Sequence, residues 1–160
     1  MRQVSVEALN AAANAVHHAL GPGLSEVVYQ TALAIDLRKR GCTVETEVVI
    51  PIFYHQTYVG FVRADLVVNQ CTVVEVKAVA KITEAHMLQL ENYMRWLPRN
   101  RMFQGGGGQG AVINFGKHVS VIGSVADPST AVAKGDDEGD TTAEEDEGDA
   151  APRVQVMKTM

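Results

Sequence analysis

Cysteine is scarce in this sequence, which contains only Cys42 and Cys71 among its 160 residues. The two lie far apart, and neither belongs to a CxxC pair. A disulfide framework and a zinc site built on cysteine pairs are therefore not indicated. We expect both residues to be buried, reduced thiols.

Long apolar segments are also missing from the sequence. No run of apolar residues approaches the roughly 18 that a membrane-spanning helix needs. The first twenty residues carry Glu7, Asn10 and Asn14, where a secretory signal peptide has a continuous apolar centre. These absences predict a cytoplasmic protein with no membrane partner.

Charge is distributed unevenly along the chain, whose formal net charge is −5. Residues 135–149 hold nine acids and neither a basic nor an aromatic residue, whereas residues 1–134 hold twelve Lys or Arg against ten acids. Such an acidic run cannot bury enough apolar surface to offset the entropy lost on ordering. We therefore expect one domain over residues 1–127 and an acidic disordered tail over residues 128–160.

Changes in the period of the apolar residues divide the domain into the order α-α-β-β-β-α-β-β. Gly21-Pro22-Gly23 separates the first two helical patterns. Turn-prone pairs at His55-Gln56 and Asn69-Gln70 then interrupt β-branched segments. This order predicts an α+β sandwich in which the first strands are antiparallel neighbours. The predicted elements are helices over 4–20 and 25–40, strands over 43–50, 52–68 and 71–79, a helix over 83–96, and strands over 111–115 and 119–123.

The second predicted helix has Ser25 as its N-cap and Gly41 as its stop signal. Its apolar residues are numerous enough to predict a broad buried surface. That surface is predicted to include Val27, Val28, Leu33, Ile35 and Leu37.

Charged side chains interrupt a β-branched stretch that ought to be buried, RADLVVNQCTVVEVKA. Burying an isolated charge costs several kcal/mol or more, so these groups need partners. Glu75 and Lys77 are two residues apart, and in a strand they share one face while the alternating apolar residues point into the core. The two charges are therefore neighbours.

The position of Asp65 depends on how the hairpin before Glu75 is connected. With a two-residue turn at Asn69-Gln70, Asp65 would pair with Val74 and face the core. With an odd number of loop residues, or with a bulge, Asp65 would lie opposite Glu75. We expect the second arrangement, because it collects two carboxylates and an ammonium group as a site for a hard divalent cation such as Mg²⁺.

The order of Asp65, Glu75-Val76-Lys77 resembles the motif of the PD-(D/E)xK nuclease superfamily. The stretch GLSEVVY, with Gly23, Glu26 and Tyr29, is similar to the signature of the bacterial GxxExxY proteins. The resemblance covers about residues 10–123 and rests on the order and spacing of several strings. These strings also include VHHALGPG, RADLVV, VVEVKAV, the Gln89 and Tyr93 pair, and INFG.

The resemblance implies a restriction-endonuclease-like α/β/α core, with a mixed sheet that contains antiparallel strands and is flanked by helices. It implies that Asp65 and Glu75 bind Mg²⁺ or Mn²⁺ and that Lys77 positions the attacking water. Glu26, on the second helix, would be a further acidic contributor to catalysis. The chain departs from the family pattern in its glycine-rich segment at 104–110 and in its acidic tail.

The third predicted helix carries residues that would border the site. His86, Gln89 and Tyr93 follow one another at helical spacing and share a stripe. Together with the motif residues, they imply a divalent-metal-dependent nuclease that hydrolyses phosphodiester bonds of nucleic acid, with DNA as the expected partner. The alternative is a non-catalytic nucleic-acid-binding or regulatory module that retains the nuclease fold.

Several of these residues also have a structural interpretation. Glu75 and Lys77 alone are typical of a salt bridge on an exposed strand, worth at most about 1 kcal/mol. Glu26 is equally well explained as a first-turn acid that complements the helix dipole. Tyr29 is expected to pack, and His17 to pair with the end of its helix.

The acidic tail has two interpretations. One is a solvated appendage without contact to the site. The other is a tethered polyanion that competes with nucleic acid for a slightly basic domain. An adaptor function for the tail has only the acidic composition in its favour.

Overall fold

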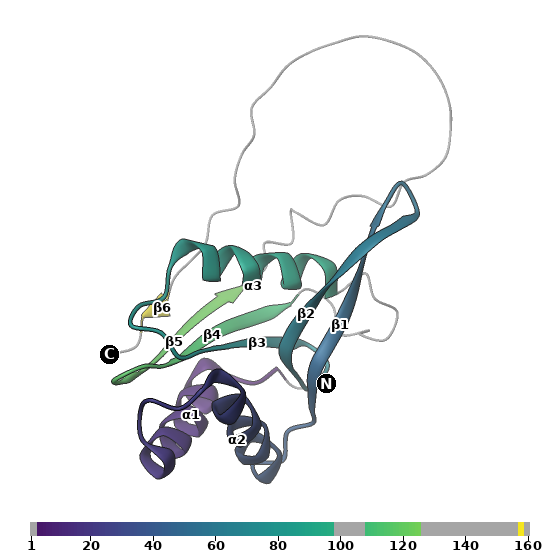
Figure 1. Cartoon of the computed structure of the whole chain (residues 1–160). Helices are drawn as coiled ribbons and strands as arrows, with labels where there is room; N and C mark the ends of the chain where they lie inside the picture. Colours follow the sequence, from purple (N-terminus) through teal and green to yellow (C-terminus); the bar gives the residue numbers. More distant parts are fainter. Residues whose placement is uncertain (1–2, 98–107, 126–156, 159–160) are drawn as a thin grey trace, which may run out of the picture.

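The computed structural model describes residues 3–97, 108–125 and 157–158, and Figure 1 shows its arrangement. Its element order agrees with the order predicted from apolar periodicity, with a short additional strand at the end. The elements are α1 (Val6–Leu20), α2 (Glu26–Lys39), β1 (Val44–Tyr54), β2 (Thr57–Val68), β3 (Thr72–Lys77), α3 (Glu84–Trp96), β4 (Gln109–Phe115), β5 (Val119–Val125) and β6 (Met157–Lys158).

The six strands form one sheet whose spatial order follows the sequence, from β1 to β6. Neighbouring strands are antiparallel except for β3 and β4, which are parallel. This exception follows from the connection between them, because parallel neighbours need a crossover and α3 lies within it. The predicted fold class, an α+β sandwich with a mixed sheet, is therefore confirmed.

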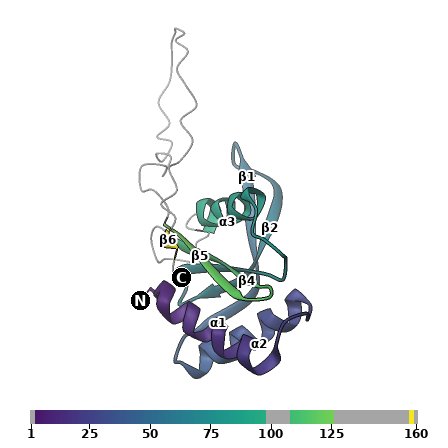
Figure 2. The ribbon, with the colours of Figure 1, turned by 90° about the vertical axis from the view of Figure 1, so that its left-hand side faces the viewer.

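Helices cover both faces of the sheet. Figures 1 and 2 show α1 and α2 on one face and α3 on the other. The larger buried cluster joins α1 and α2 to the sheet through residues such as Leu9, Leu33 and Ile113. The smaller cluster joins α3 to the opposite face and includes Leu90 and Val112.

Alternation along β3 explains why a short strand can serve both cores. Val74 and Val76 are buried in the α1 and α2 cluster, whereas Val73 belongs to the α3 cluster. Ala78 packs against the first cluster, as its predicted orientation requires. Glu75 therefore points to the α3 face of a strand that is covered on both sides.

The buried face of α2 differs from the prediction. Val27, Val28 and Ile35 are exposed, and the buried residues of this helix are Tyr29, Gln30, Leu33, Ala34 and Leu37. The prediction counted apolar residues without requiring that they share a face. The observed set recurs at three- and four-residue spacing, which places its members on one side of a helix.

The β1–β2 hairpin turns over along its length, so that residues of the same parity face α1 and α2 near its base and face α3 farther out. Val44 and Leu66 belong to the cluster under α1 and α2, but Val48 and Ala64 belong to the α3 cluster. Even-numbered residues of a regular strand would share one face. The change occurs where Glu47 has a left-handed φ of 54°, which only a few per cent of non-glycine residues adopt. The outer half of the hairpin projects beyond the rest of the sheet (Figure 1).

Other sequence predictions concern residues at the margins of the domain. Cys71 is buried, whereas Cys42 is only partly buried. In the described part of the chain, no helix combines the length and apolar character needed to cross a bilayer. Of the predicted tail, Met157–Lys158 is described and pairs with β5, while the rest of residues 128–160 lies outside the described residues.

Candidate metal and catalytic centre

The hairpin between β2 and β3 has the odd loop that the sequence analysis favoured. Leu66 pairs with Val74 and Val68 with Thr72, which leaves residues 69–71 as a three-residue connection. Asn69 and Gln70 form its turn with left-handed φ angles of 51° and 59°. Continuing the register by one residue places Asp65 opposite Glu75. The predicted odd-numbered loop is therefore confirmed.

Strands β2 and β3 stop pairing just before Asp65. The last paired residues are Leu66 and Val74, and the main-chain N–H of Val76 instead donates to Oδ2 of Asp65 at 2.8 Å. The carboxylate thus replaces the main-chain acceptor that β2 no longer supplies, which keeps a strand N–H satisfied. It also holds the Asp65 side chain at the opening between the two strands.

Glu75 is a buried carboxylate with an incomplete set of partners. It is 2% exposed, and its Oε1 accepts a hydrogen bond of 2.7 Å from Nζ of Lys77. Its Oε2 is buried and has no hydrogen-bond partner. Burial raises the pKa of Glu75 to about 7, against the Lys77 hydrogen bond and with a contribution from the charge of Asp65.

The Lys77 side chain is 13% exposed and remains an ammonium group at neutral pH. Burial acts to lower its pKa, but the hydrogen bond and charge of Glu75, together with the charges of Glu26 and Asp65, raise it above the ordinary value. The pKa of Asp65 is raised too, mainly by burial, in spite of the N–H of Val76 and the charge of Lys77. The site therefore gathers negative charge around one cation.

The donor set fits a small, hard cation. Glu75 Oε2 is a buried oxygen without a partner, and buried polar atoms of this kind are rare unless a water or an ion satisfies them. No group of three His, Cys, Asp or Glu residues within ion-binding reach occurs in the described ranges. An ion held by Asp65 and Glu75 would thus complete its coordination with water and substrate oxygens, as Mg²⁺ commonly does.

Glu26 lies at the first turn of α2 and contacts the end of β3. Its Oε1 accepts a hydrogen bond of 3.1 Å from the main-chain N–H of Ala78, the residue after Lys77. Its side chain is exposed, and its negative charge contributes to the raised pKa of Glu75. The structure therefore places Glu26 beside the centre and gives it a positioning contact as well.

Gln89 and Tyr93 meet on α3, but His86 does not join them. Nε2 of Gln89 donates to the Tyr93 hydroxyl at 2.5 Å, and both line an open cavity of about 360 Å³. Burial raises the pKa of Tyr93, with smaller contributions from Glu75 and Asp65. His86 does not line this cavity, and its Nδ1 accepts from the N–H of Thr83 at 3.2 Å and caps the helix.

A family model described as the PD-(D/E)XK nuclease superfamily matches residues 3–123. The chain belongs to this superfamily. The matched segment contains both flanking helix layers and the strands that carry Asp65, Glu75 and Lys77. Searches of curated proteins and of solved structures found no match.

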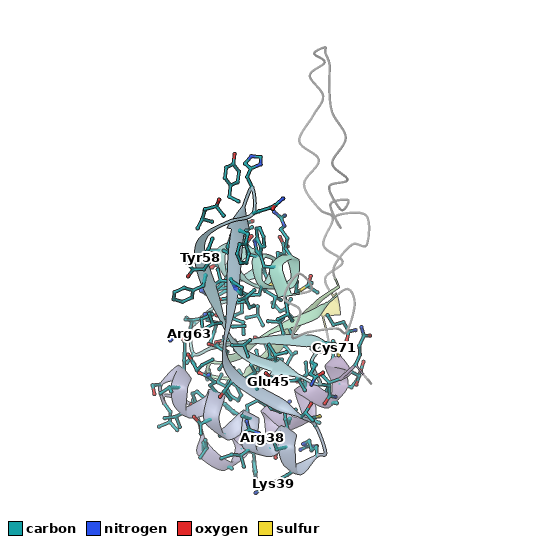
Figure 3. The ribbon with its side chains drawn as sticks, turned by 90° about the vertical axis from the view of Figure 1, so that its right-hand side faces the viewer. Arg38, Lys39, Glu45, Tyr58, Arg63 and Cys71 are labelled. Atoms are coloured by element: carbon teal, nitrogen blue, oxygen red, sulfur yellow. The ribbon has the colours of Figure 1, made fainter. Side chains whose placement is uncertain are left out.

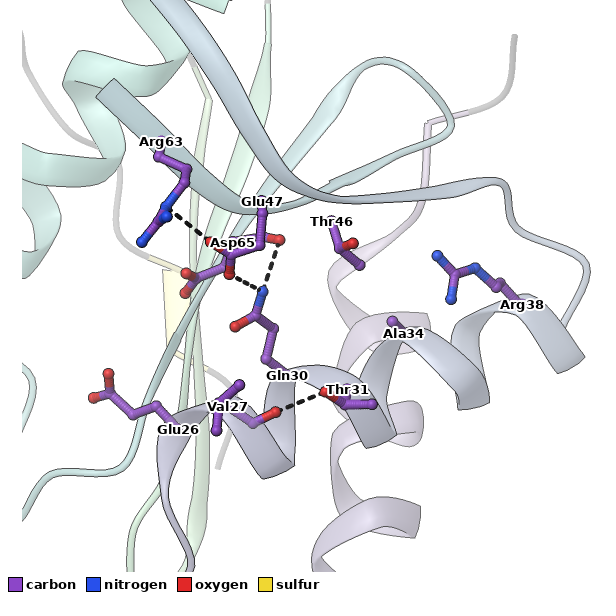
Figure 4. A pocket seen from close by; sticks show the side chains of 10 residues that line it. All are labelled: Glu26, Val27, Gln30, Thr31, Ala34, Arg38, Thr46, Glu47, Arg63 and Asp65. Carbon is purple, nitrogen blue, oxygen red and sulfur yellow. Dashed lines mark hydrogen bonds and ion pairs between the residues drawn. The ribbon is translucent and has the colours of Figure 1, made fainter. Parts of the chain in front are cut away.

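The PD-(D/E)XK domain also contains site residues that the sequence analysis missed. Nε2 of the buried Gln30 donates to Glu47 Oε1 at 2.6 Å and to the main-chain oxygen of Asp65 at 3.2 Å (Figure 4). Arg63 in turn pairs with Glu47 at 2.8 Å. Glu26, Gln30, Arg63 and Asp65 all line one cavity of about 620 Å³.

The signals for these missed residues differ. Gln30 follows Glu26 by four residues, so helical spacing places both on one face of α2. Glu47 and Arg63 carry no comparable signal, because they meet only where the hairpin turns over. The charge of Glu47 contributes to the raised pKa of Asp65.

In this PD-(D/E)XK domain, Gly23 and Tyr29 hold the start of α2 against the sheet. The Tyr29 hydroxyl donates to the oxygen of Gly21 at 2.6 Å and accepts from the N–H of Leu24 at 3.2 Å. Its ring is buried and stacks on Phe115, with centroids 4.5 Å apart. Tyr29 packs, as predicted, and Gly23 provides a left-handed φ of 96° in the same loop.

Two further strings of the resemblance join the ends of elements. Asn114, in INFG, exchanges two hydrogen bonds of 2.9 Å with the main chain of Val79 beyond β3. Nε2 of His17 makes a hydrogen bond of 3.1 Å with the oxygen of Gly116. His17 thus connects α1 to the loop after β4, a contact more specific than the helix-end pairing expected for it.

Proposed function

We propose that this PD-(D/E)XK protein is a divalent-metal-dependent nuclease that hydrolyses phosphodiester bonds of nucleic acid, with DNA as its substrate. The observation that carries the proposal is Glu75 Oε2, a buried oxygen without a partner beside Asp65 and Lys77. Grouping buried charges with incomplete hydrogen bonding is costly for folding. A bound cation and a phosphate would satisfy the groups that the protein leaves open.

Each residue has a role that follows from its surroundings. Asp65 and Glu75 would hold Mg²⁺ or Mn²⁺, which supplies a more acidic bound water and stabilises the charge that develops on phosphate. Lys77 stays protonated because its pKa is raised, so it suits holding a water or stabilising phosphate charge rather than taking up a proton. Glu26 would add negative charge at the edge of the site.

Gln89 and Tyr93 would form the border of the substrate pocket. Their hydroxyl and amide groups lie on α3, on the face of the sheet toward which Glu75 points. We also assign the chain to the GxxExxY proteins. Gly23, Glu26 and Tyr29 support this assignment because each has a defined structural place. Gly23 lies in the loop before α2, Tyr29 donates a hydrogen bond to that loop, and Glu26 connects the first turn of α2 to the N–H of Ala78.

A second function has one observation in its favour. Lys77 pairs directly with Glu75, and such a buried pair can be purely structural in a module that binds nucleic acid without cleaving it. The two functions differ in what loss of the ammonium group does. A structural pair matters for stability, whereas a catalytic lysine matters for turnover.

Cleavage assays distinguish the two functions. Purified full-length protein would be incubated with labelled single-stranded DNA, duplex DNA and RNA in Mg²⁺, in Mn²⁺ or in EDTA. We expect metal-dependent cleavage that Lys77→Ala abolishes and that Lys81→Ala, a change at an exposed lysine, leaves intact. Binding without cleavage of any substrate by the wild type would instead identify the non-catalytic module.

A further inference from the structure

The outer half of the β1–β2 hairpin carries a row of exposed aromatic side chains on one face. Phe61 pairs with Pro51, and Tyr58 pairs with Phe53, whose ring centroid lies 6.0 Å away. Phe53, Tyr58 and Phe61 are 49%, 56% and 58% exposed. We call these three residues the aromatic stripe, and Figure 3 labels Tyr58 on the hairpin that carries it.

The opposite face of the same hairpin is covered. Ile50 is fully buried, and Val62 packs against the α3 cluster. The pleat therefore sends alternate residues either to α3 or to the open face. Within the part of the chain that the structure describes, the aromatic stripe is exposed rather than packed against another element. Exposed apolar groups gathered in this way mark interaction sites.

The aromatic stripe lies next to a cavity of the candidate centre. Arg63, two residues after Phe61 on β2, lines this cavity together with Asp65. A strand rises by about 3.3 Å per residue, which places Phe61 about 13 Å along the strand from Asp65. A ligand bound at Asp65 can thus reach the stripe.

The chemistry of the stripe favours bases over phosphates. The cation beside the stripe on β2 is Arg63, and its guanidinium group is already paired with Glu47. Aromatic rings stack on unpaired bases of any sequence. Bases within a duplex are stacked on one another and offer only their edges, so a duplex cannot use such a surface in the same way.

We propose that unpaired bases of the substrate stack on Phe53, Tyr58 and Phe61 while a neighbouring phosphate lies at the centre formed by Asp65, Glu75 and Lys77. The substrate is then nucleic acid with a single-stranded segment. This inference rests on the proposed function for the position of the phosphate. Its binding step does not require cleavage, so the two are tested separately.

The test is fluorescence anisotropy of the full-length protein in EDTA, with one labelled DNA oligonucleotide presented as a single strand or as a blunt duplex. We expect the single strand to bind more tightly. Phe61→Leu and Tyr58→Leu keep apolar bulk but remove the rings, and each should weaken single-strand binding about tenfold while leaving duplex binding unchanged. Ile35→Ala, at an exposed apolar residue of α2, is the matched control and should change neither.

Three outcomes would overturn the inference. The first is equal affinity for single strand and duplex, and the second is single-strand binding that neither ring substitution alters. The third is a dimer in light scattering that Phe61→Leu dissociates, which would identify a second copy of the chain as the occupant. Circular dichroism of both variants confirms folding before comparison.

Cleavage measured in parallel separates this inference from the proposed function. Ring-dependent binding of a single strand that is never cut in Mn²⁺ would reject the nuclease and retain the stripe as a binding surface. Cleavage of the single strand in Mn²⁺ that neither Phe61→Leu nor Tyr58→Leu slows would retain the nuclease and reject the stripe.

Discussion

Asp65 Oδ2 accepts the main-chain N–H of Val76 at 2.8 Å across the point where β2 and β3 cease to pair. The Asp65 carboxylate therefore accepts a hydrogen bond from a main-chain N–H of β3 that has no main-chain partner on β2. The same carboxylate is a proposed ligand of the candidate metal centre. A side chain that replaces a strand acceptor is held firmly by the backbone. The geometry of the centre thus depends on the sheet itself.

The metal-binding role of Asp65 is tested by Asp65→Asn. The amide oxygen can still accept from Val76, so the hairpin should remain intact, but one negative charge is lost from the ion site. We expect Mn²⁺ affinity to fall at least tenfold in calorimetry. The melting temperature without metal should stay equal or rise, because Asp65 repels Glu75. Glu45→Gln, at an exposed acid of β1, is the control, and equal Mn²⁺ binding by Asp65→Asn would refute the role.

The catalytic role of Lys77 is separated from its ion pair by two variants. Lys77→Met leaves Glu75 buried without its donor, so we expect lost cleavage and a modest loss of stability. Lys77→Met combined with Glu75→Gln removes both charges and should recover the melting temperature without recovering cleavage. Thermal unfolding and single-turnover cleavage check this. A large drop in stability with unchanged cleavage would identify a structural salt bridge instead.

The pH dependence of stability follows from Glu75, whose pKa burial raises from 4.5 to about 7. Between pH 4.5 and about 7, the native protein keeps a proton on Glu75 that the unfolded chain has released. The free energy of unfolding therefore falls as the pH rises through this interval and is lowest once Glu75 is ionised in the native protein. Denaturant unfolding without metal at pH 5 to 8 should show this decline, and Glu75→Gln should reduce it. Mn²⁺ binding should strengthen over the same rise in pH, because the ligand must be ionised. Identical pH profiles for wild type and Glu75→Gln would contradict the assignment.

The contribution of Glu26 is tested by changing its charge and its hydrogen bond separately. Glu26→Gln retains an acceptor for the N–H of Ala78, so stability should not change, while cleavage should fall a few-fold through the lost charge. Glu26→Ala also removes the hydrogen bond and should cost about 1 kcal/mol of unfolding free energy. Cleavage unaltered by Glu26→Gln would limit Glu26 to positioning α2.

Periodicity predicted most of the fold because the relevant signals are local. Glycine and turn pairs bound the helices and strands, and helix ends agree with prediction to within about two residues. The face of α2 was predicted incorrectly, since Val27 and Ile35 are apolar yet lie away from the sheet. The packing of Tyr29 on Phe115 and the burial of Leu33 and Leu37 show which side of this helix faces the sheet.

The sequence by itself determined that Glu75 and Lys77 share a face, because residues two apart in a strand must do so. Its motif also indicated that Asp65 belongs with them. The tertiary structure decided between the two possible hairpin registers, through the three-residue loop at 69–71. It alone brought Glu47, Gln30 and Arg63 to the centre, because they meet where the hairpin turns over, and such a change of face depends on packing between distant elements rather than on local spacing.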